Sequence, residues 1–543
     1  QNCGFQQVRI NGLDGPYTQI LIDSRPVFSA LSGVYGLEQI PASMIERVEV
    51  MRGGGSALFG SSAIAGIINI ITKEPLRNSG QLSHTITSLG GSSSFDNNTS
   101  LNASLVTDDH RAGLYIFGQN RYRSGYDYDG DGFTELPKLK NQTVGFRSYL
   151  KTSTYSKLTF EYHHMQEFRR GGDMLNRPPH EAHIAEQLQH SIDGGSLKFD
   201  YFSPDEKNRL SVFASAANTD RDSYYGPGND PLKAYGKTTD LTAMGGAQYV
   251  HTFDKCFFMP SDLTAGLEYN RDRLKDNMWG YNRHTDQTVN IYSAFLQNEW
   301  KNDRWGILIG GRLDKHNMVD NVIFSPRANL RFNPTQNINL RLSYSSGFRA
   351  PQAFDEDMHI ENVGGTVAMI ERAKDLKEEK SQSFSASADM YHRFGAFQTN
   401  LLIEGFYTRL TDVFVLGEPY DRGDGILVKT RSNGPGAKVM GLTLEGKVAY
   451  LSILQIQAGL TLQRSRYDEP HKWHDDAPAE KKIFRTPDTY GYFTATCTPI
   501  KPLSIALSGT YTGRMLVQRM DITAENAELG EMPERKAEAI RTP

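Results

Sequence analysis

Apolar and polar residues alternate with a period of two along most of the chain, from about Gly80 onward. The alternation is clearest in the segments 158–163, 338–344, 384–390, 442–450, 454–462 and 503–511. Successive side chains of a β-strand point to opposite faces. The pattern therefore predicts many strands, each with one apolar and one polar face.

The connections between these predicted strands alternate in length. Short connections fall at 152–156, 203–208, 301–304, 333–337 and 498–502. Long loops fall between them, at 122–137, 167–189, 219–236, 273–287, 347–379, 411–436 and 465–484. Short turns on one rim and long loops on the other are typical of a transmembrane β-barrel of the outer membrane. A β-sandwich or a propeller would not place a long loop at every second connection.

The strand count adds to this prediction. We count about nineteen strands before a last long loop at 520–543.

The first 75 residues do not follow the alternating pattern. Pro41 can occupy the first turn of a short helix, in which Met44, Ile45 and Val48 recur at helical spacing. Strands are predicted at 48–51 and 67–72, and the glycines at 53–55 predict a turn between them. This part is a small α+β domain.

The amino-acid sequence of this N-terminal segment contains a motif that is specific to one family. It resembles the plug domain of TonB-dependent outer-membrane receptors, in which the pattern I-P, I-E-R-V-E-V, R-G, S-A-L-G, A-G and N-I-I-T-K runs in this order. The matching residues are Ile40, Pro41, Ile45, Glu46, Arg47, Val48, Glu49, Val50, Arg52, Gly53, Ser56, Ala57, Leu58, Gly60, Ala63, Gly66, Asn69, Ile70, Ile71, Thr72 and Lys73. The segment 9–27 fits the same domain. We predict a plug over 1–76, lacking its N-terminal part, and a barrel over 77–543, lacking its C-terminal strands. A barrel that holds a plug is expected to have about 22 strands, so the missing ones would lie past Pro543.

The resemblance implies active transport. A plug fills the barrel, long external loops capture a scarce, bulky ligand, and TonB, energised by ExbB and ExbD, pulls on the plug. The segment that contacts TonB and the secretion signal are expected upstream of Gln1. Outer-membrane lipid and a surface lipoprotein are further expected partners, and the predicted location is the outer membrane of a Gram-negative bacterium.

Composition and the lack of certain sequence motifs argue against several other classes of protein. The mean hydropathy is −0.51, and no run approaches the roughly 18 apolar residues of a membrane helix. The net charge of −4 gives no sign of nucleic-acid binding. Three cysteines, Cys3, Cys256 and Cys497, cannot form a disulfide framework. Catalytic motifs such as G-x-S-x-G, H-E-x-x-H and the P-loop do not occur, so we predict no enzyme and no catalytic cofactor.

One long loop carries the first half of a calcium-binding pattern. Asp127, Asp129, Asp131 and Glu135 stand at positions 1, 3, 5 and 9 of an EF-hand-like loop, and Phe133 would give its carbonyl. Position 12 is Lys138, not the usual bidentate Glu. A calcium ion that stiffens the loop is weighed against a solvated acidic turn.

A second family motif lies in the loop 347–379. Phe348-Arg-Ala-Pro351, followed by the segment 375–381, resembles the F-R-A-P and N-P-x-L-x-P-E-x-S pair of TonB-dependent receptors. In haem-receptor relatives this interval carries a histidine that ligates iron, and His359 lies in it here. Lys374 and Glu378 replace the two prolines of the second motif, so a surface histidine is the stronger interpretation of His359.

These motifs and the aromatic residues of the long loops give the candidate ligand-binding residues. They are Asp14, Tyr17, Val34, Tyr35, Tyr224, Tyr225, Trp279, Tyr281, Phe348, Arg349 and His359. The plug wording resembles the cobalamin and haem receptors of Bacteroidetes-type bacteria, and we rank cobalamin first, haem second and a siderophore third. A passive porin, a structural or adhesin-like barrel and a soluble β-protein are the alternatives of another class.

Overall fold

The structure is a computed structural model of the chain. It describes residues 8–13, 15–26, 40–53, 60, 63–227, 234–353, 358, 368–423, 426–472, 478–522 and 535–542.

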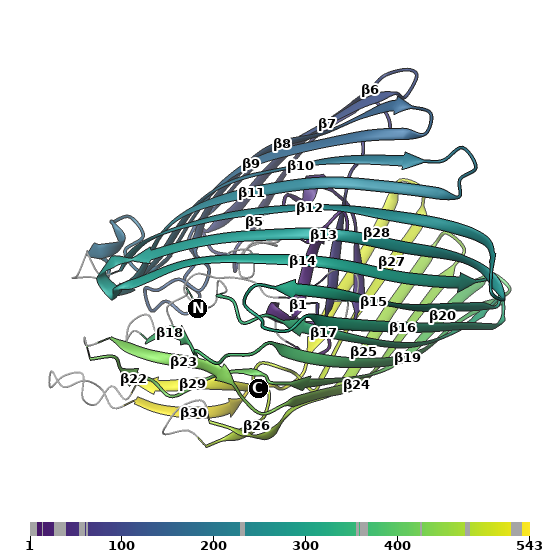
Figure 1. Ribbon diagram of the computed structural model, residues 1–543. Coiled ribbons are helices and arrows are strands. Elements are labelled where there is room, and N and C mark those ends of the chain that lie inside the picture. The colour runs from purple at the N-terminus through teal and green to yellow at the C-terminus, as the bar shows by residue number, and fades with distance from the viewer. Residues whose placement is uncertain are drawn as a thin grey trace.

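A large antiparallel β-barrel makes up most of the described chain (Figure 1). Its strands are β5 (Ser79–Ser88), β6 (Phe95–Val106), β7 (Ala112–Arg123), β8 (Lys138–Ser153), β9 (Ser156–Gly172), β10 (Ile184–Phe202), β11 (Asn208–Pro227), β12 (Tyr235–Cys256), β13 (Met259–Met278), β14 (Arg283–Lys301), β15 (Trp305–His316), β16 (Ile323–Thr335), β17 (Ile338–Arg349), β19 (Glu379–Phe394), β20 (Phe397–Thr411), β24 (Ala437–Tyr450), β25 (Leu454–His471), β26 (Glu480–Lys482), β27 (Thr489–Ile500) and β28 (Leu503–Thr512). Within the described residues these are nineteen long strands and the three-residue β26, as the alternating pattern predicted.

The two faces of the strands explain the low hydropathy. On β15, Ile309 points outward and is 57% exposed, whereas Arg312 and Asp314 are buried on the inner face. Inside the barrel, Arg312 contacts Asp314 at 2.8 Å and Glu268 at 2.7 Å. The inner face is thus built from paired polar groups, so each strand alternates apolar-out and polar-in. Among the described residues we find no helix with the length and apolar character that crossing a membrane requires.

The short turns are confirmed, but several long loops are shorter than predicted. β9 continues to Gly172 and β10 begins at Ile184, against a predicted loop over 167–189. β13 and β14 likewise leave only the short helix η4 (Trp279–Tyr281) and Asn282 between them. The backbone ladder continues past the apolar belt, where neither face must be apolar, so the alternation that marks a strand is lost.

The N-terminal domain is a four-stranded sheet inside the barrel, drawn in purple in Figure 1. Its order is β2 (Arg25–Pro26), β1 (Thr18–Ile22), β4 (Gly66–Thr72) and β3 (Ile45–Arg52), with the 3-10 helices η1 (Gly15–Tyr17) and η2 (Ala42–Met44). The predicted helix through Ile45 and Val48 is wrong, because those residues lie in β3 and pair with β4. Their β-branched side chains favour a strand once a partner is present.

The domain is fixed in the lumen by apolar and charged contacts. Ile10 and Leu13 share one buried cluster with Phe406 and Leu410 of β20. The predicted boundary at 76/77 falls in the connection between β4 and β5 and stays a prediction.

Charged residues add contacts between the domain and the wall. The Arg147 guanidinium of β8 binds the Asp23 carboxylate and lies 3.4 Å from Glu74, which Lys157 also contacts at 3.1 Å. Arg52 of β3 contacts Glu404 of β20 at 2.9 Å. Asp23 and Arg52 belong to the N-terminal domain, and Glu74 lies in the connection between β4 and β5. These ion pairs therefore hold the domain against the barrel wall.

Smaller elements gather at the long-loop end of the barrel (Figure 1). β18 (Ala368–Arg372), β21 (Phe414–Leu416), β22 (Tyr420–Asp421) and β23 (Leu427–Asn433) form one small sheet, and β29 (Leu516–Ile522) pairs with β30 (Arg535–Arg541). The helix η3 (Pro179–Glu181) lies between β9 and β10.

Candidate ligand-binding site

A cavity of about 650 Å³ lies at the long-loop end, between the η4–β14 segment and the small sheet. Its lining includes four basic residues of Lys or Arg type, one histidine and a single carboxylate: Arg283, Arg372, Lys374, Arg422, His284 and Glu371. Met318, Met358 and Met369 supply apolar lining. The cavity is therefore suited to a ligand with apolar surface and negative charge.

Hydrogen bonds fix most of these basic groups in place. Arg283 Nε donates to the Asp276 carboxylate at 2.7 Å, and Arg422 contacts Glu371 at 3.3 Å. Arg372 donates at 2.7 Å to Gln287 Oε1 and at 3.0 Å to the carbonyl of Pro351. Among the described lining residues, Lys and Arg side chains outnumber carboxylates.

A second, smaller cavity of about 250 Å³ lies where the N-terminal domain meets the barrel wall. Tyr17 of η1 donates its hydroxyl to Glu379 Oε1 at 2.9 Å, which joins the domain to the first residue of β19. Arg349, the last residue of β17, lies 3.7 Å from Glu379 Oε2. Its guanidinium also stands 5.8 Å from the ring centre of Tyr17 and 5.5 Å from that of Phe414.

Electrostatics at this junction are dominated by burial. Burial raises the pKa of the Tyr17 phenol well above its ordinary value of 10.0, and the adjacent Glu379 carboxylate raises it further. Tyr17 therefore stays protonated and remains a donor to Glu379. Arg349 supplies the opposing positive charge.

One short segment borders both cavities. Arg349 lines the smaller cavity, and Pro351 and Ala353 line the larger one. Arg372 donates to the Pro351 carbonyl at 3.0 Å, which joins the lining of the larger cavity to the chain two residues after Arg349.

The structure brings together some of the predicted ligand-binding residues. Tyr17 and Arg349 meet at the smaller cavity. Tyr224, Tyr225 and Tyr281 share a buried cluster that includes Met369 of the larger cavity, and Tyr281 donates to the Tyr225 carbonyl at 3.2 Å.

Other predicted residues lie apart or cannot be placed. Trp279 is 57% exposed, and Phe348 is buried in a separate cluster with Val319 and Ile323. Asp14, Val34, Tyr35 and His359 lie outside the described residues.

Sequence reasoning missed the basic lining and the partners of Arg349. Glu379 lies in the segment 375–381 but has no site role predicted from the sequence, and Phe414 lies in the predicted loop 411–436, which shows no motif. Their only sequence signal is the frequency of arginine in the long loops. Which arginines face one cavity depends on strand register and on the small sheet of β18 and β23.

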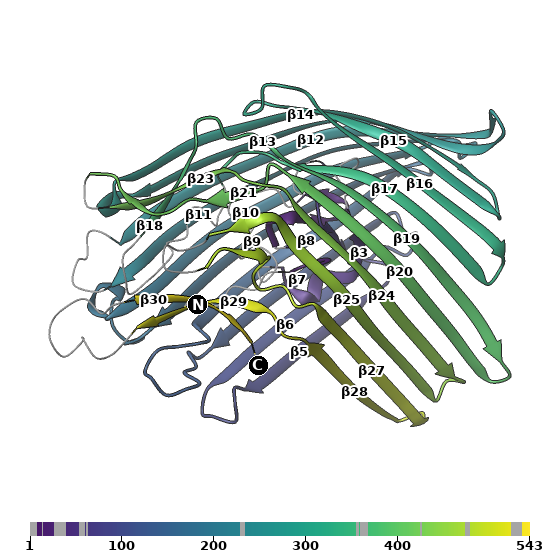
Figure 2. The same ribbon diagram turned by 90° about the horizontal axis from the view of Figure 1, so that it is seen from below.

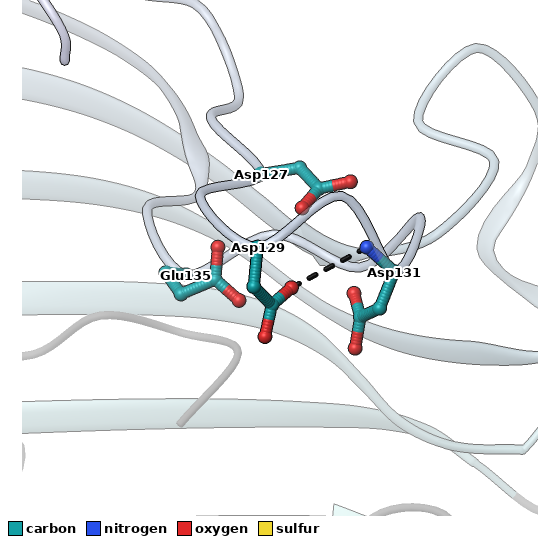
Figure 3. Close-up of side chains that lie close together, drawn as sticks. All are labelled: Asp127, Asp129, Asp131 and Glu135. Carbon is teal, nitrogen blue, oxygen red and sulfur yellow. Dashed lines mark hydrogen bonds between the residues drawn. The ribbon is translucent and has the colours of Figure 1, made fainter.

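The predicted calcium loop joins β7 to β8 (Figure 3). Asp127, Asp129, Asp131 and Glu135 each offer a carboxylate oxygen, and these four atoms all lie within 4.8 Å of one another. Asp127 also accepts from the Gly130 and Gly132 N–H groups at 2.7 and 2.8 Å, and Asp129 accepts from the Asp131 N–H at 3.3 Å. Phe133 donates its N–H to Asp131 at 2.8 Å. The donor set, all oxygen and partly prearranged, fits Ca²⁺.

Two family models match the chain. The model described as "TonB dependent receptor-like, beta-barrel" matches residues 69–518, and "TonB-dependent Receptor Plug Domain" matches residues 1–67.

Curated relatives are matched over part of their length. The vitamin B12 transporter BtuB of Vibrio vulnificus is 23% identical over 64% of this chain and 54% of its own. The iron-regulated outer membrane virulence protein of Vibrio cholerae is 27% identical over 64% of this chain and 51% of its own. The chain thus spans about half the length of these relatives.

Solved structures share the fold over nearly the whole chain. The siderophore receptor PirA of Acinetobacter baumannii superposes with a TM-score of 0.78 at 17% identity, covering 98% of this chain and 85% of its own. A mutant of the ferric enterobactin receptor of Pseudomonas aeruginosa, in complex with enterobactin, gives a TM-score of 0.76 at 18% identity, covering 99% of this chain and 86% of its own. At this identity the likeness concerns the fold.

Proposed function

Because the chain belongs to the TonB-dependent receptor family, we propose that it imports a bulky, anionic metal chelate of the ferric-siderophore type across the outer membrane. The observation that carries this proposal is the larger cavity, whose lining holds Arg283, Arg372, Lys374 and Arg422 against Glu371. Basic side chains around a cavity attract a negatively charged ligand and fix its orientation.

The smaller cavity suggests how binding reaches the plug. The Tyr17 phenol and the Arg349 guanidinium both contact Glu379. A ligand anion beside Arg349 competes with Glu379 for the guanidinium. This competition changes the contacts of the Glu379 carboxylate, which accepts the hydrogen bond from Tyr17. Ligand occupancy and plug seating are then coupled through three side chains.

Cobalamin import, ranked first from the sequence, is the second candidate function. It is favoured by the match to a vitamin B12 transporter. The basic lining of the larger cavity places cobalamin import below import of an anionic chelate, because basic side chains attract an anionic ligand most strongly. Haem import depends on His359, which lies outside the described residues.

Energy coupling and location follow from the same proposal. TonB, with ExbB and ExbD, would pull on the plug, the outer wall would face outer-membrane lipid, and a surface lipoprotein could hand over the ligand. The role is that of a transporter without enzymatic activity.

An uptake assay tests the import role. Cells that carry the complete receptor take up radioactive iron from an anionic ferric chelate, and we expect uptake to vanish without TonB. The variant Arg349→Gln should lower uptake at least tenfold while the barrel still inserts. Uptake that persists without TonB would make the protein a passive pore.

We also propose that the β7–β8 loop binds one calcium ion that stiffens it, as the clustered carboxylates support. Calcium should raise the melting temperature of the complete receptor, and a chelator should reverse the rise. The pair Asp129→Asn and Asp131→Asn should abolish the effect, whereas the control pair Asp254→Asn and Asp303→Asn, at the opposite rim, should keep it. An equal calcium response in both pairs would contradict the site.

A further inference from the structure

The outer wall of the barrel carries an apolar groove of about 1040 Å³ that spans β15, β16, β17, β19, β20 and β24. These strands lie side by side in Figure 2. We call this feature the wall groove. Its floor contains the small residues Ala328, Ala386 and Gly405, which explains why the surface is hollow there.

The wall groove is on the outward face of the strands. On β20, Phe406 is buried in the cluster that includes Ile10 and Leu13 of the plug, whereas its neighbour Tyr407 is exposed and lines the groove. Because successive strand residues point to opposite faces, Gly405, Tyr407 and Arg409 face outward.

Strand register arranges the outward residues in layers. Leu342, Ala386, Gly405, Leu442 and Leu462 pair across neighbouring strands and form an apolar row. An aromatic row lies closer to the long-loop end, two positions further along each strand. It consists of Tyr344, Phe384 and Tyr407. Aromatic rows of this kind mark the membrane–water interface.

The next row is polar and basic. Gln382, Arg409, Lys438 and Arg466 pair across four strands, one step beyond the aromatic row. Arg464 and Lys380 lie beside this row and are exposed. We call the five basic residues of this region the basic rim.

The basic rim has an excess of positive charge. Asp468 accepts from Arg409 at 2.6 Å and lies 3.8 Å from Lys438, and Glu378 contacts Lys380 at 2.9 Å. These two carboxylates face five basic side chains. A further cavity of about 460 Å³ lies next to the wall groove and shares Tyr344 with it. Lys380, Gln382 and Arg409 also line this cavity, so the hollow continues to the basic rim.

We propose that the wall groove and the basic rim together bind a phosphate-bearing lipid with several acyl chains, taken from the membrane around the barrel. The acyl chains lie in the groove, and the phosphate lies against Arg409, Lys438 and Arg466. This site is separate from the ligand cavity and rests only on the outer-membrane location of the barrel.

Three observations favour a lipid over a protein partner. The apolar row lies on the short-turn side of the aromatic row, at a depth of the membrane where the surroundings are hydrocarbon. The cations lie where lipid phosphates lie. Six strands at intervals of roughly 4.8 Å make the groove on the order of 24 Å across, which is wide enough for more than one chain.

The test uses the complete receptor in detergent, with bisphosphorylated lipid A and its dephosphorylated counterpart as probes. Native mass spectrometry counts the lipids that stay bound. The rim variant carries Lys438→Gln, Arg464→Gln and Arg466→Gln. Its charge-matched control carries Lys151→Gln, Lys255→Gln and Lys501→Gln at the short-turn end. The groove variant Gly405→Phe fills the floor without a backbone clash, since a Cβ there has nothing within 4 Å.

We expect wild type and control to retain bisphosphorylated lipid A at least tenfold better than the rim variant, and the groove variant to lose it as well. Equal retention of the two probes, or equal retention by rim variant and control, would overturn the proposal. Retention of no lipid by the wild type would overturn it too. Binding of a ferric chelate, measured on the same samples, reports separately on the import role and should not change in the rim variant.

Discussion

At the residue scale, Arg349 is the point where the plug, the barrel wall and the smaller cavity meet. The F-R-A-P motif identified it from the sequence, and the structure places its guanidinium 5.8 Å from the ring centre of Tyr17 and 5.5 Å from that of Phe414. The cation is held by two ring faces and one carboxylate 3.7 Å away, a geometry that Lys cannot reproduce with the same planar contacts.

The Tyr17–Glu379 hydrogen bond should contribute measurably to plug seating. Tyr17→Phe removes the donor and leaves a buried carboxylate with one partner fewer, which we expect to cost about 1–3 kcal/mol of plug stability. Urea unfolding of the complete receptor, followed by proteolysis of the released plug, measures this loss.

A double-mutant cycle isolates this interaction. Glu379→Gln alone should destabilise the plug, and the double variant should cost clearly less than the sum of the two single changes. Strict additivity would show that the two side chains do not act together.

Much of this site was beyond sequence reasoning for a physical reason. Tyr17 and Arg349 carry local motifs and were predicted. Glu379 and Phe414 become neighbours of Arg349 only through the β17–β19 register and the loop before β24, which no local pattern encodes.

At the element scale, the period-two pattern predicted the strands and short turns, but not how far strands extend beyond the apolar belt. The hairpin of β9 and β10 is an example. At its tip, Asp173 accepts from the Ile184 N–H at 3.0 Å and from His183 at 2.6 Å. These contacts order a segment that the sequence placed in a loop.

This hairpin tip should loosen in acid. Burial raises the pKa of Asp173, but the hydrogen bonds from Ile184 and His183 outweigh it, and the pKa lies below its ordinary value of 3.8. The carboxylate therefore stabilises the tip at pH values above about 3.8, and the stabilisation is lost as pH falls through the lowered pKa.

Hydrogen exchange of the Ile184 amide, corrected for the intrinsic rate, measures this effect. Protection should fall on acidification in the wild type. Asp173→Asn should have low protection throughout and no such pH dependence. A wild-type amide whose protection does not change below pH 3.8 would contradict the role of Asp173.

At the scale of the whole molecule, a plug held by ion pairs closes a wide barrel. Arg147 and Lys157 bind the Asp23 and Glu74 carboxylates, and Arg52 binds Glu404. Unlike the apolar cluster of Ile10 and Leu13 with β20, such ion pairs are weakened by salt.

Removing these charges should loosen the plug. In planar bilayers, the pair Asp23→Asn and Glu74→Gln should open a conducting channel at a lower urea concentration than the wild type. The control Asp254→Asn removes the exposed Lys207 ion pair, whose side chains are 40% and 80% exposed, and should leave conductance unchanged. Identical urea thresholds in all three proteins would show that the plug is held by other contacts.

Parallel calorimetric titration of the complete receptor with an anionic ferric siderophore, cyanocobalamin and haemin tests the central claim most directly. We predict saturable binding of the ferric chelate, weakened at least tenfold by the pair Arg372→Gln and Lys374→Gln, and no comparable binding of the other two. Saturable cyanocobalamin binding that these substitutions leave unchanged would contradict the claim that the basic cavity selects an anionic ligand.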